Sequence, residues 1–224
     1  MKIVSYDSKL MKFLNTFCDV AFLNLLWIIG CIPIVTIGTS TIAAYTVTLK
    51  IVKGTEGYIA RDFFKAYKNN LKHGILLTFI LAIPLYSAWI SFQLFQNLEN
   101  NPFYFLLVAI LLVFVFVWHV VYIFPIEASY ENKLINNLIN ARRVFMRFPL
   151  QSILICILCA AEGFVFFFWC FVYDNTFSHV LMWIGILIGP MCIMMTISGM
   201  VLPLFKKIDD NDESDLEDTN ISVN

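Results

Sequence analysis

Charged residues are scarce in this sequence. Only 14% of its 224 residues are Asp, Glu, Lys or Arg, whereas a soluble domain has about 25%. Hydrophobic residues make up 60% of the chain, and its mean hydropathy is +0.79. A soluble core of this length could not bury so much apolar surface and still present a polar coat to water. The composition therefore excludes a soluble globular domain and predicts an integral membrane protein.

Because charges are scarce, five runs of the sequence contain almost none. The short segments of alternating polarity that membrane barrel strands need are also missing. A helix crosses the bilayer core with about 20 apolar residues, and a helix in lipid pairs its backbone groups internally. The runs therefore predict membrane-spanning helices, and they cover residues 20–49, 74–98, 100–126, 148–172 and 175–205.

Lysine and arginine are absent from two short links, at residues 97–101 and 174–178. Short loops that carry Lys and Arg stay on the cytoplasmic side of a membrane. We therefore predict that the two links are external and that the basic blocks are cytoplasmic. All 15 basic residues fall into four such blocks, at residues 2–12, 50–72, 133–147 and 206–207.

The predicted fold class is all-α, a polytopic membrane protein with about six hydrophobic segments and both termini in the cytoplasm. Residues 1–208 are expected to form one membrane-embedded domain. Residues 209–224 are expected to be a disordered acidic tail, because seven of the ten residues 209–218 are carboxylates. The predicted segments are 13–31, 35–52, 74–97, 102–125, 150–173 and 178–205.

The first hydrophobic run allows three topologies. Its middle, residues 30–38, contains two glycines and Pro33, which are residues that interrupt helices. A hairpin that crosses twice and turns at Pro33 agrees best with the basic residues on both sides. A re-entrant hairpin that never reaches the far side is the second topology. A single tilted span with an external N-terminus is the third.

Catalytic and cofactor signatures are missing. The sequence has no phosphate-binding loop, no dinucleotide fingerprint, and no zinc-protease or serine-hydrolase motif. Its six cysteines lie in or beside hydrophobic runs, and the pair Cys156 and Cys159 lacks a second ligand pair at metal-binding spacing. We therefore expect no enzyme activity, no metal and no cofactor, and cysteines that pack as small apolar residues.

Two basic blocks, residues 60–73 and 131–148, predict amphipathic helices on the cytoplasmic side. In the first block the cations recur at intervals of four, three and four residues, which places them in one helical stripe beside a separate aromatic face. Such a helix can lie on anionic lipid or dock a protein partner, or it can simply enforce topology. The membrane tether and the net charge of −1 argue against nucleic acid. The candidate docking surface comprises Arg61, Phe63, Phe64, Lys65, Tyr67, Lys68 and Lys72.

Three ionisable residues within the hydrophobic segments form a candidate intramembrane polar site: Glu162, His119 and Asp19. A charged carboxylate at mid-membrane costs roughly 2.5–3.5 kcal/mol on insertion scales, so Glu162 should face other helices. It could couple transport to a proton, with His119 or Asn and Thr groups as partners, or hold two helices together by a buried hydrogen bond. Glu127, just past Pro125, is expected at the interface, in contact with water.

Three stretches of the sequence carry a family resemblance: LNLLWIIGCIPIVTIGTSTIAAYTVTLK at residues 23–50, GYIARDFFKAYKNN at 57–70 and YIFPIEASYENKLINNLINARRVFMRFP at 122–149. In these stretches the chain resembles the YesL-like family of small membrane proteins of Gram-positive bacteria, a family of unknown function. The resemblance implies a multi-pass protein of the bacterial plasma membrane, associated with carbohydrate uptake and polysaccharide breakdown. It implies no catalytic residues.

Two functional hypotheses follow. The first is a non-enzymatic accessory or scaffold protein that docks subunits of a membrane transport complex, in a system that takes up carbohydrate. The second is a small secondary carrier with a buried carboxylate, Glu162, in its pathway, since carriers use broken helices and buried carboxylates. An intramembrane enzyme has no positive support, and the sequence does not predict an oligomeric state.

Overall fold

The computed structural model of the chain describes residues 9–55, 57–98, 103–130, 132–172, 185 and 188–208. All regular elements within these residues are helices. In chain order they are α1 (Lys9–Cys31), the 3-10 turn η1 (Ile34–Thr36), α2 (Ile37–Lys53), α3 (Ile59–Asn69), α4 (Leu71–Asn97), α5 (Phe103–Ser129), α6 (Leu134–Arg147), α7 (Pro149–Val172) and a C-terminal helix, Ile188–Ile208.

The predicted all-α membrane fold is confirmed. Among the described residues, five helices are long and apolar enough to cross a membrane: α1, η1 with α2, α4, α5 and the C-terminal helix. A sixth candidate is the bent pair of α6 and α7, whose axes meet at 101°. The six predicted segments coincide with these helices, except that most of 178–187 lies outside the described residues. The predicted acidic tail, 209–224, also lies outside them.

Both predicted amphipathic helices form, as α3 and α6, but the first is shorter than the predicted 60–73. It ends at Asn69, and α4 begins at Leu71, so Lys72 belongs to α4. The side-chain amide of Asn70 donates to the carbonyl of Ala66 at 3.0 Å, a local bond of the kind that competes with helix continuation. The pattern of charges could not reveal this break, because the cationic spacing continues across it.

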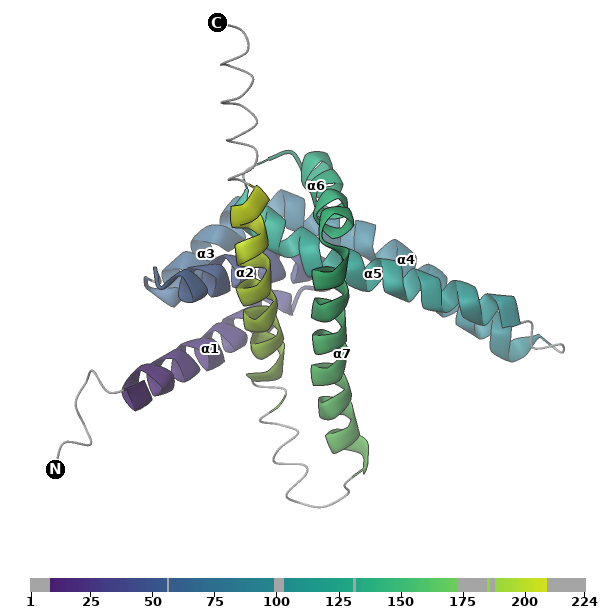
Figure 1. The fold of residues 1–224 in the computed structure, drawn as a ribbon, viewed down its shortest axis with the longest axis horizontal. Coiled ribbons are helices and arrows are strands. Elements are labelled where there is room, and N and C mark those ends of the chain that lie inside the picture. The colour runs from purple at the N-terminus through teal and green to yellow at the C-terminus, as the bar shows by residue number, and fades with distance from the viewer. Residues whose placement is uncertain are drawn as a thin grey trace, which may run out of the picture.

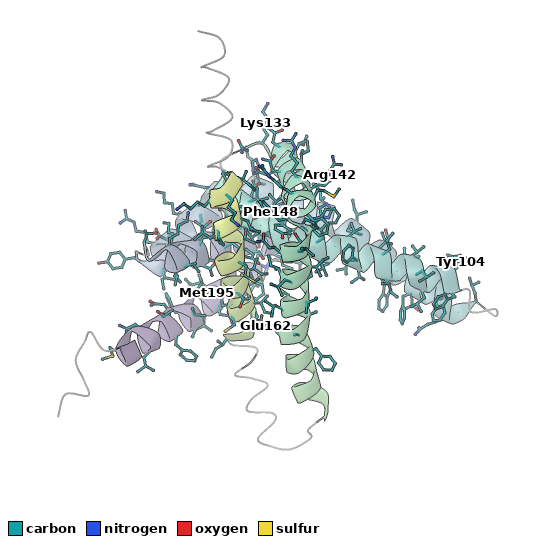
Figure 2. All side chains as sticks on the ribbon, viewed as in Figure 1. Tyr104, Lys133, Arg142, Phe148, Glu162 and Met195 are labelled. Atoms are coloured by element: carbon teal, nitrogen blue, oxygen red, sulfur yellow. The ribbon has the colours of Figure 1, made fainter. Side chains whose placement is uncertain are left out.

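Three helical arms diverge from a shared core (Figure 1). The α4–α5 pair forms one arm, α7 and the C-terminal helix form a second, and α1 forms the third. Figure 2 shows Tyr104 at the far tip of the α4–α5 arm, whereas Lys133 and Arg142 lie on α6 beside the core. The core therefore lies on the predicted cytoplasmic side. Buried side chains at its centre include Leu23, Ile42, Phe63, Leu77, Tyr122, Ile155 and Val201.

Helix α2 meets α4 through a glycine contact. The backbone nitrogen of Gly38 donates to the Thr78 hydroxyl at 2.9 Å, and the Thr39 hydroxyl donates to the carbonyl of Leu71 at 3.3 Å. A Cβ atom on Gly74 would lie 2.3 Å from the Cα of Thr39. The two backbones approach this closely only because both positions lack a side chain. All five residues in this contact lie within the first eight residues of α2 or α4.

The first hydrophobic run breaks at Ile32 and Pro33, as predicted, and the turn lies beside α3. Gly30, just before the turn, accepts a long hydrogen bond of 3.5 Å from the Tyr67 hydroxyl. Gly38, just after it, contacts the first two turns of α4. Since α3 is predicted to be cytoplasmic, this placement favours the re-entrant hairpin over one that crosses twice.

Candidate functional site

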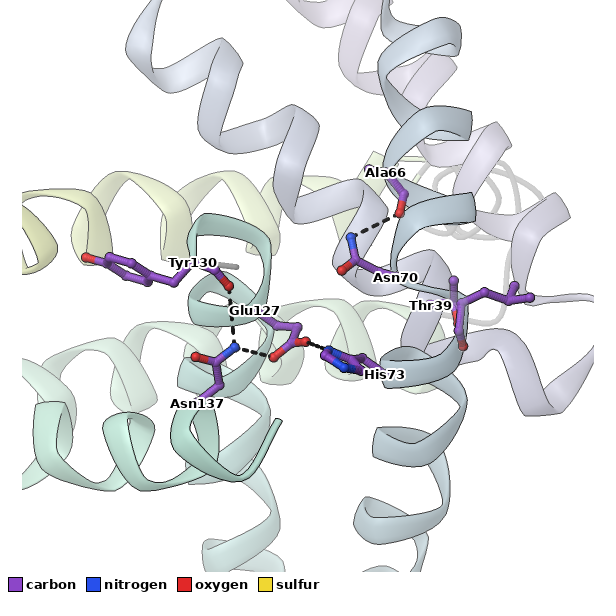
Figure 3. Close-up of polar contacts among 8 residues, drawn as sticks. Thr39, Ala66, Asn70, His73, Glu127, Tyr130 and Asn137 are labelled. Carbon is purple, nitrogen blue, oxygen red and sulfur yellow. Dashed lines mark hydrogen bonds and ion pairs between the residues drawn. The ribbon is translucent and has the colours of Figure 1, made fainter. Parts of the chain in front are cut away.

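Glu127, in the last turn of α5, is a buried carboxylate whose side chain is only 2% exposed. Its Oε1 pairs with Nδ1 of His73 on α4, and its Oε2 accepts a 2.5 Å hydrogen bond from the side-chain amide of Asn137 on α6 (Figure 3). The same amide lies 3.5 Å from the carbonyl oxygen of Tyr130. One carboxylate therefore joins the three consecutive helices α4, α5 and α6.

The bonding partners in this cluster indicate which nitrogen of His73 carries a hydrogen. An ionised carboxylate only accepts hydrogen bonds, so Nδ1 of His73 must carry the hydrogen that it shares with Glu127. The ring nitrogen that remains is Nε2, and no described residue bonds to it. Leaving a buried acceptor without its partner typically costs about 1–3 kcal/mol, so the bond from His73 to the buried Glu127 constrains the packing of α4 against α5.

The expectation that Glu127 meets water is wrong. The helix does not end at Pro125 but continues to Ser129, and α6 folds back over this last turn, so the carboxylate is enclosed. Sequence reasoning also missed His73 and Asn137. Neither stands at helical spacing from Glu127, because they lie 54 and 10 residues away in the chain. The one available signal was a lone carboxylate at the end of a hydrophobic run.

Next to this cluster is a polar pocket of about 450 Å³, between α2, α3 and the adjoining ends of α4 and α5. Lys50 of α2 and Asp62 of α3 form an ion pair of 2.9 Å in its wall, and both are partly exposed. The pocket thus combines two ion pairs with neutral amides and one further cation. Its polar lining residues are Thr46, Lys50, Asp62, Lys65, Asn69, Asn70, His73, Glu127, Ser129 and Asn132.

The candidate docking surface on α3 divides into an exposed part and a buried part. Phe64 is 49% exposed, whereas Phe63 is 1% exposed and packs into the core. Tyr67 is half-buried against α1. Including Phe63 in an exposed surface was wrong, because α3 needs one apolar side to pack on α1 and α2. Four cations, here called the cation row, are exposed: Arg61, Lys65, Lys68 and Lys72.

The predicted intramembrane site is not assembled as one cluster. Glu162 on α7 accepts a hydrogen bond of 3.1 Å from the Thr196 hydroxyl on the C-terminal helix, and its second oxygen, Oε2, is buried without a partner among the described residues. His119 bonds the carbonyl of Val115 on its own helix at 2.7 Å. Asp19 is half-buried on α1. Glu162 and His119 therefore bond to different partners.

Metal binding has no support from the part of the chain that the structure describes. Within it, no group of three or more His, Cys, Asp or Glu side chains is placed to hold an ion. His73 and Glu127 face each other, but a third ligand is lacking.

Comparison with known proteins gives one match. Residues 20–92 match the model of a family described as a protein of unknown function, DUF624. This stretch contains the α1–α2 turn, α2, α3 and most of α4, and so includes the Gly38–Gly74 contact and His73. Glu127 and Asn137 lie beyond it. No curated protein matches the chain, and no solved structure does.

Proposed function

We propose that this chain is a non-enzymatic accessory protein that docks a partner on the cytoplasmic side of the membrane. The observation that carries the proposal is the cation row. Its four side chains are exposed, while Phe63 and Tyr67 hold α3 firmly on the core. Three of these cations lie on α3 and the fourth, Lys72, lies at the start of α4. Such a row of exposed cations favours a partner with an acidic surface, because complementary charge steers association and sets orientation.

The proposed system is a membrane transport complex for carbohydrate in a bacterial plasma membrane. Support for a carbohydrate transport system comes from the resemblance to the YesL-like family. The match of residues 20–92 to a family of unknown function is compatible with this system. The exposed cations of α3 and α6 lie beside the core, whereas the α4–α5 arm exposes many large apolar side chains. A subunit that works from the cytoplasmic side would have this distribution.

The docking proposal is tested by recovering partners from native membranes in mild detergent. We expect a partner with the wild-type chain and about tenfold less, or none, with Arg61, Lys65, Lys68 and Lys72 all changed to Gln. Each exposed ion pair contributes about 0.2–1 kcal/mol, and about 1.4 kcal/mol corresponds to a tenfold change in affinity. Mass spectrometry would identify the partner.

A matched control uses the other amphipathic helix. Lys133, Arg142, Arg143 and Arg147 are also four exposed cations, on or next to α6. Changing these four to Gln alters the net charge equally and should leave recovery unchanged. Equal loss with both variants would mean general charge attraction, and the docking proposal would then fail.

A carrier remains the second candidate, because Oε2 of Glu162 is buried without a described partner. This candidate predicts that wild-type protein acidifies pyranine-loaded liposomes when a transported sugar is added to the outside, and that Glu162→Gln abolishes the signal. The glutamine carbonyl oxygen would still accept from Thr196, so the variant should remain folded. Absence of flux in both proteins, across mono- and disaccharides, would leave Glu162 as a helix-joining group.

A further inference from the structure

The polar pocket offers hydrogen-bond donors to a ligand, while the two carboxylates in its wall, Asp62 and Glu127, already bond to groups of the protein. Both oxygens of Glu127 are bonded, one to His73 and the other to Asn137. Asp62 is paired with Lys50 at 2.9 Å. A ligand that enters the pocket therefore meets carboxylates that already bond to side chains of the protein.

Three of the groups that line the pocket can donate to a ligand from α3 and the start of α4. Nε2 of His73 is the ring nitrogen that Glu127 does not use, and the ring is 43% exposed. Lys65 is exposed and forms no ion pair with a described carboxylate. The amide of Asn69 is exposed at the end of α3. Together they supply cationic and neutral donors on one side of the pocket, from the two consecutive helices α3 and α4.

We propose that this pocket binds the phosphate group of a ligand that approaches from the cytoplasmic side. Phosphate oxygens accept charge-assisted hydrogen bonds, and a lysine ammonium is a common phosphate-binding group. A histidine ring with hydrogens on both nitrogens donates from both, so Nε2 of His73 would donate to a phosphate oxygen while Nδ1 donates to Glu127. The volume of about 450 Å³ lies in the range of small-molecule sites, and it accommodates a phosphate with a small substituent.

Two sources can provide this phosphate group. One is a soluble phosphate compound of the cytoplasm. The other is the headgroup of an anionic phospholipid, since basic pockets between membrane helices on the cytoplasmic side bind such headgroups. The pocket lies where α2 and α3 meet the core ends of α4 and α5, so both sources reach it from the same side.

The phosphate site is separable from the docking proposal. Lys65 belongs to both surfaces, but His73 lines the pocket and is absent from the cation row. Lys68 and Lys72 belong to the cation row and do not line the pocket. Partner recovery and phosphate binding can therefore fail independently.

The test measures the binding of inorganic phosphate to the purified full-length protein in detergent, by its shift of the thermal unfolding midpoint against chloride at equal ionic strength. We expect phosphate to raise the midpoint of wild type. In Lys65→Gln and in His73→Gln the apparent Kd should rise about tenfold or more, as expected for one charge-assisted hydrogen bond. The matched control, Lys68→Gln, removes the same charge one turn away on α3 and should bind like wild type.

A second experiment distinguishes the two sources of the phosphate group. The protein is placed in nanodiscs of phosphatidylcholine with or without phosphatidylglycerol, and native mass spectrometry counts retained anionic lipid. Retention that depends on Lys65 and His73, with no response to inorganic phosphate, assigns the site to a headgroup. Because the side chain of Lys65 is exposed, Lys65→Gln keeps the test valid if His73→Gln misfolds. No binding in either experiment, or an equal loss of binding in Lys68→Gln, would overturn the proposal.

Discussion

Gly74→Ala is expected to remove most of the folded protein. The added Cβ would lie 2.3 Å from the Cα of Thr39 and 2.4 Å from its backbone nitrogen, and backbone atoms cannot move aside as the end of a side chain can. Overpacking typically costs about 1–3 kcal/mol and sometimes more, and this contact belongs at the upper end. A whole domain is stable by only about 5–15 kcal/mol. The yield of monodisperse protein and the thermal unfolding midpoint in detergent measure the effect.

Gly199→Ala is the matched control for this substitution. Gly199 also lies in a helix, but no described atom comes within 4 Å of the position that a Cβ would take. Alanine is favoured over glycine within a helix by about 1 kcal/mol, so this variant should be as stable as wild type or more stable. If Gly74→Ala were equally stable, α2 and α4 would not be in backbone contact.

The α1–α2 turn is expected to be accessible from the cytoplasm. A cysteine placed in the turn should then be labelled from the inside and not at all from the outside. Ile34 in this turn is 75% exposed, and the turn lies beside α3 and the first two turns of α4. With the six native cysteines replaced by serine or alanine, Ile34→Cys should react with an impermeant maleimide in inside-out vesicles. It should not react in intact cells.

Two further cysteines calibrate this experiment. Lys68→Cys on α3 should label from the inside, and Asn97→Cys at the far end of α4 should label from the outside. Labelling of Ile34→Cys from the outside would establish a hairpin that crosses twice. If the turn is internal, Lys9→Cys then separates the two remaining topologies, because an internal N-terminus indicates a re-entrant hairpin and an external one indicates a single span.

The helices of this protein could be predicted from the sequence almost completely. Whether a residue enters lipid depends on its own polarity. A long apolar run such as 102–125 can therefore be predicted as a membrane helix without knowing which other helices pack against it. The amphipathic helices α3 and α6 were predictable for a similar reason, because the periodicity of their cations is local. The break at Pro33 also follows from local sequence. The end of α3 at Asn69 was misplaced, where a side-chain hydrogen bond favours the boundary. The end of α5 was misplaced as well, because the helix continues past Pro125 to Ser129.

The candidate site, in contrast, was decided by contacts between distant segments. Glu127 is charged, and by its own polarity it belongs in water; it is buried because His73 and Asn137 approach from two other helices. Phe63 and Phe64 are identical residues at adjacent positions, and only the packing of α3 buries one and exposes the other. The sequence determined which segments leave water, because that choice depends on the polarity of each segment alone. The tertiary structure decided which polar groups meet, because that depends on how closely helices approach at positions such as Gly38 and Gly74.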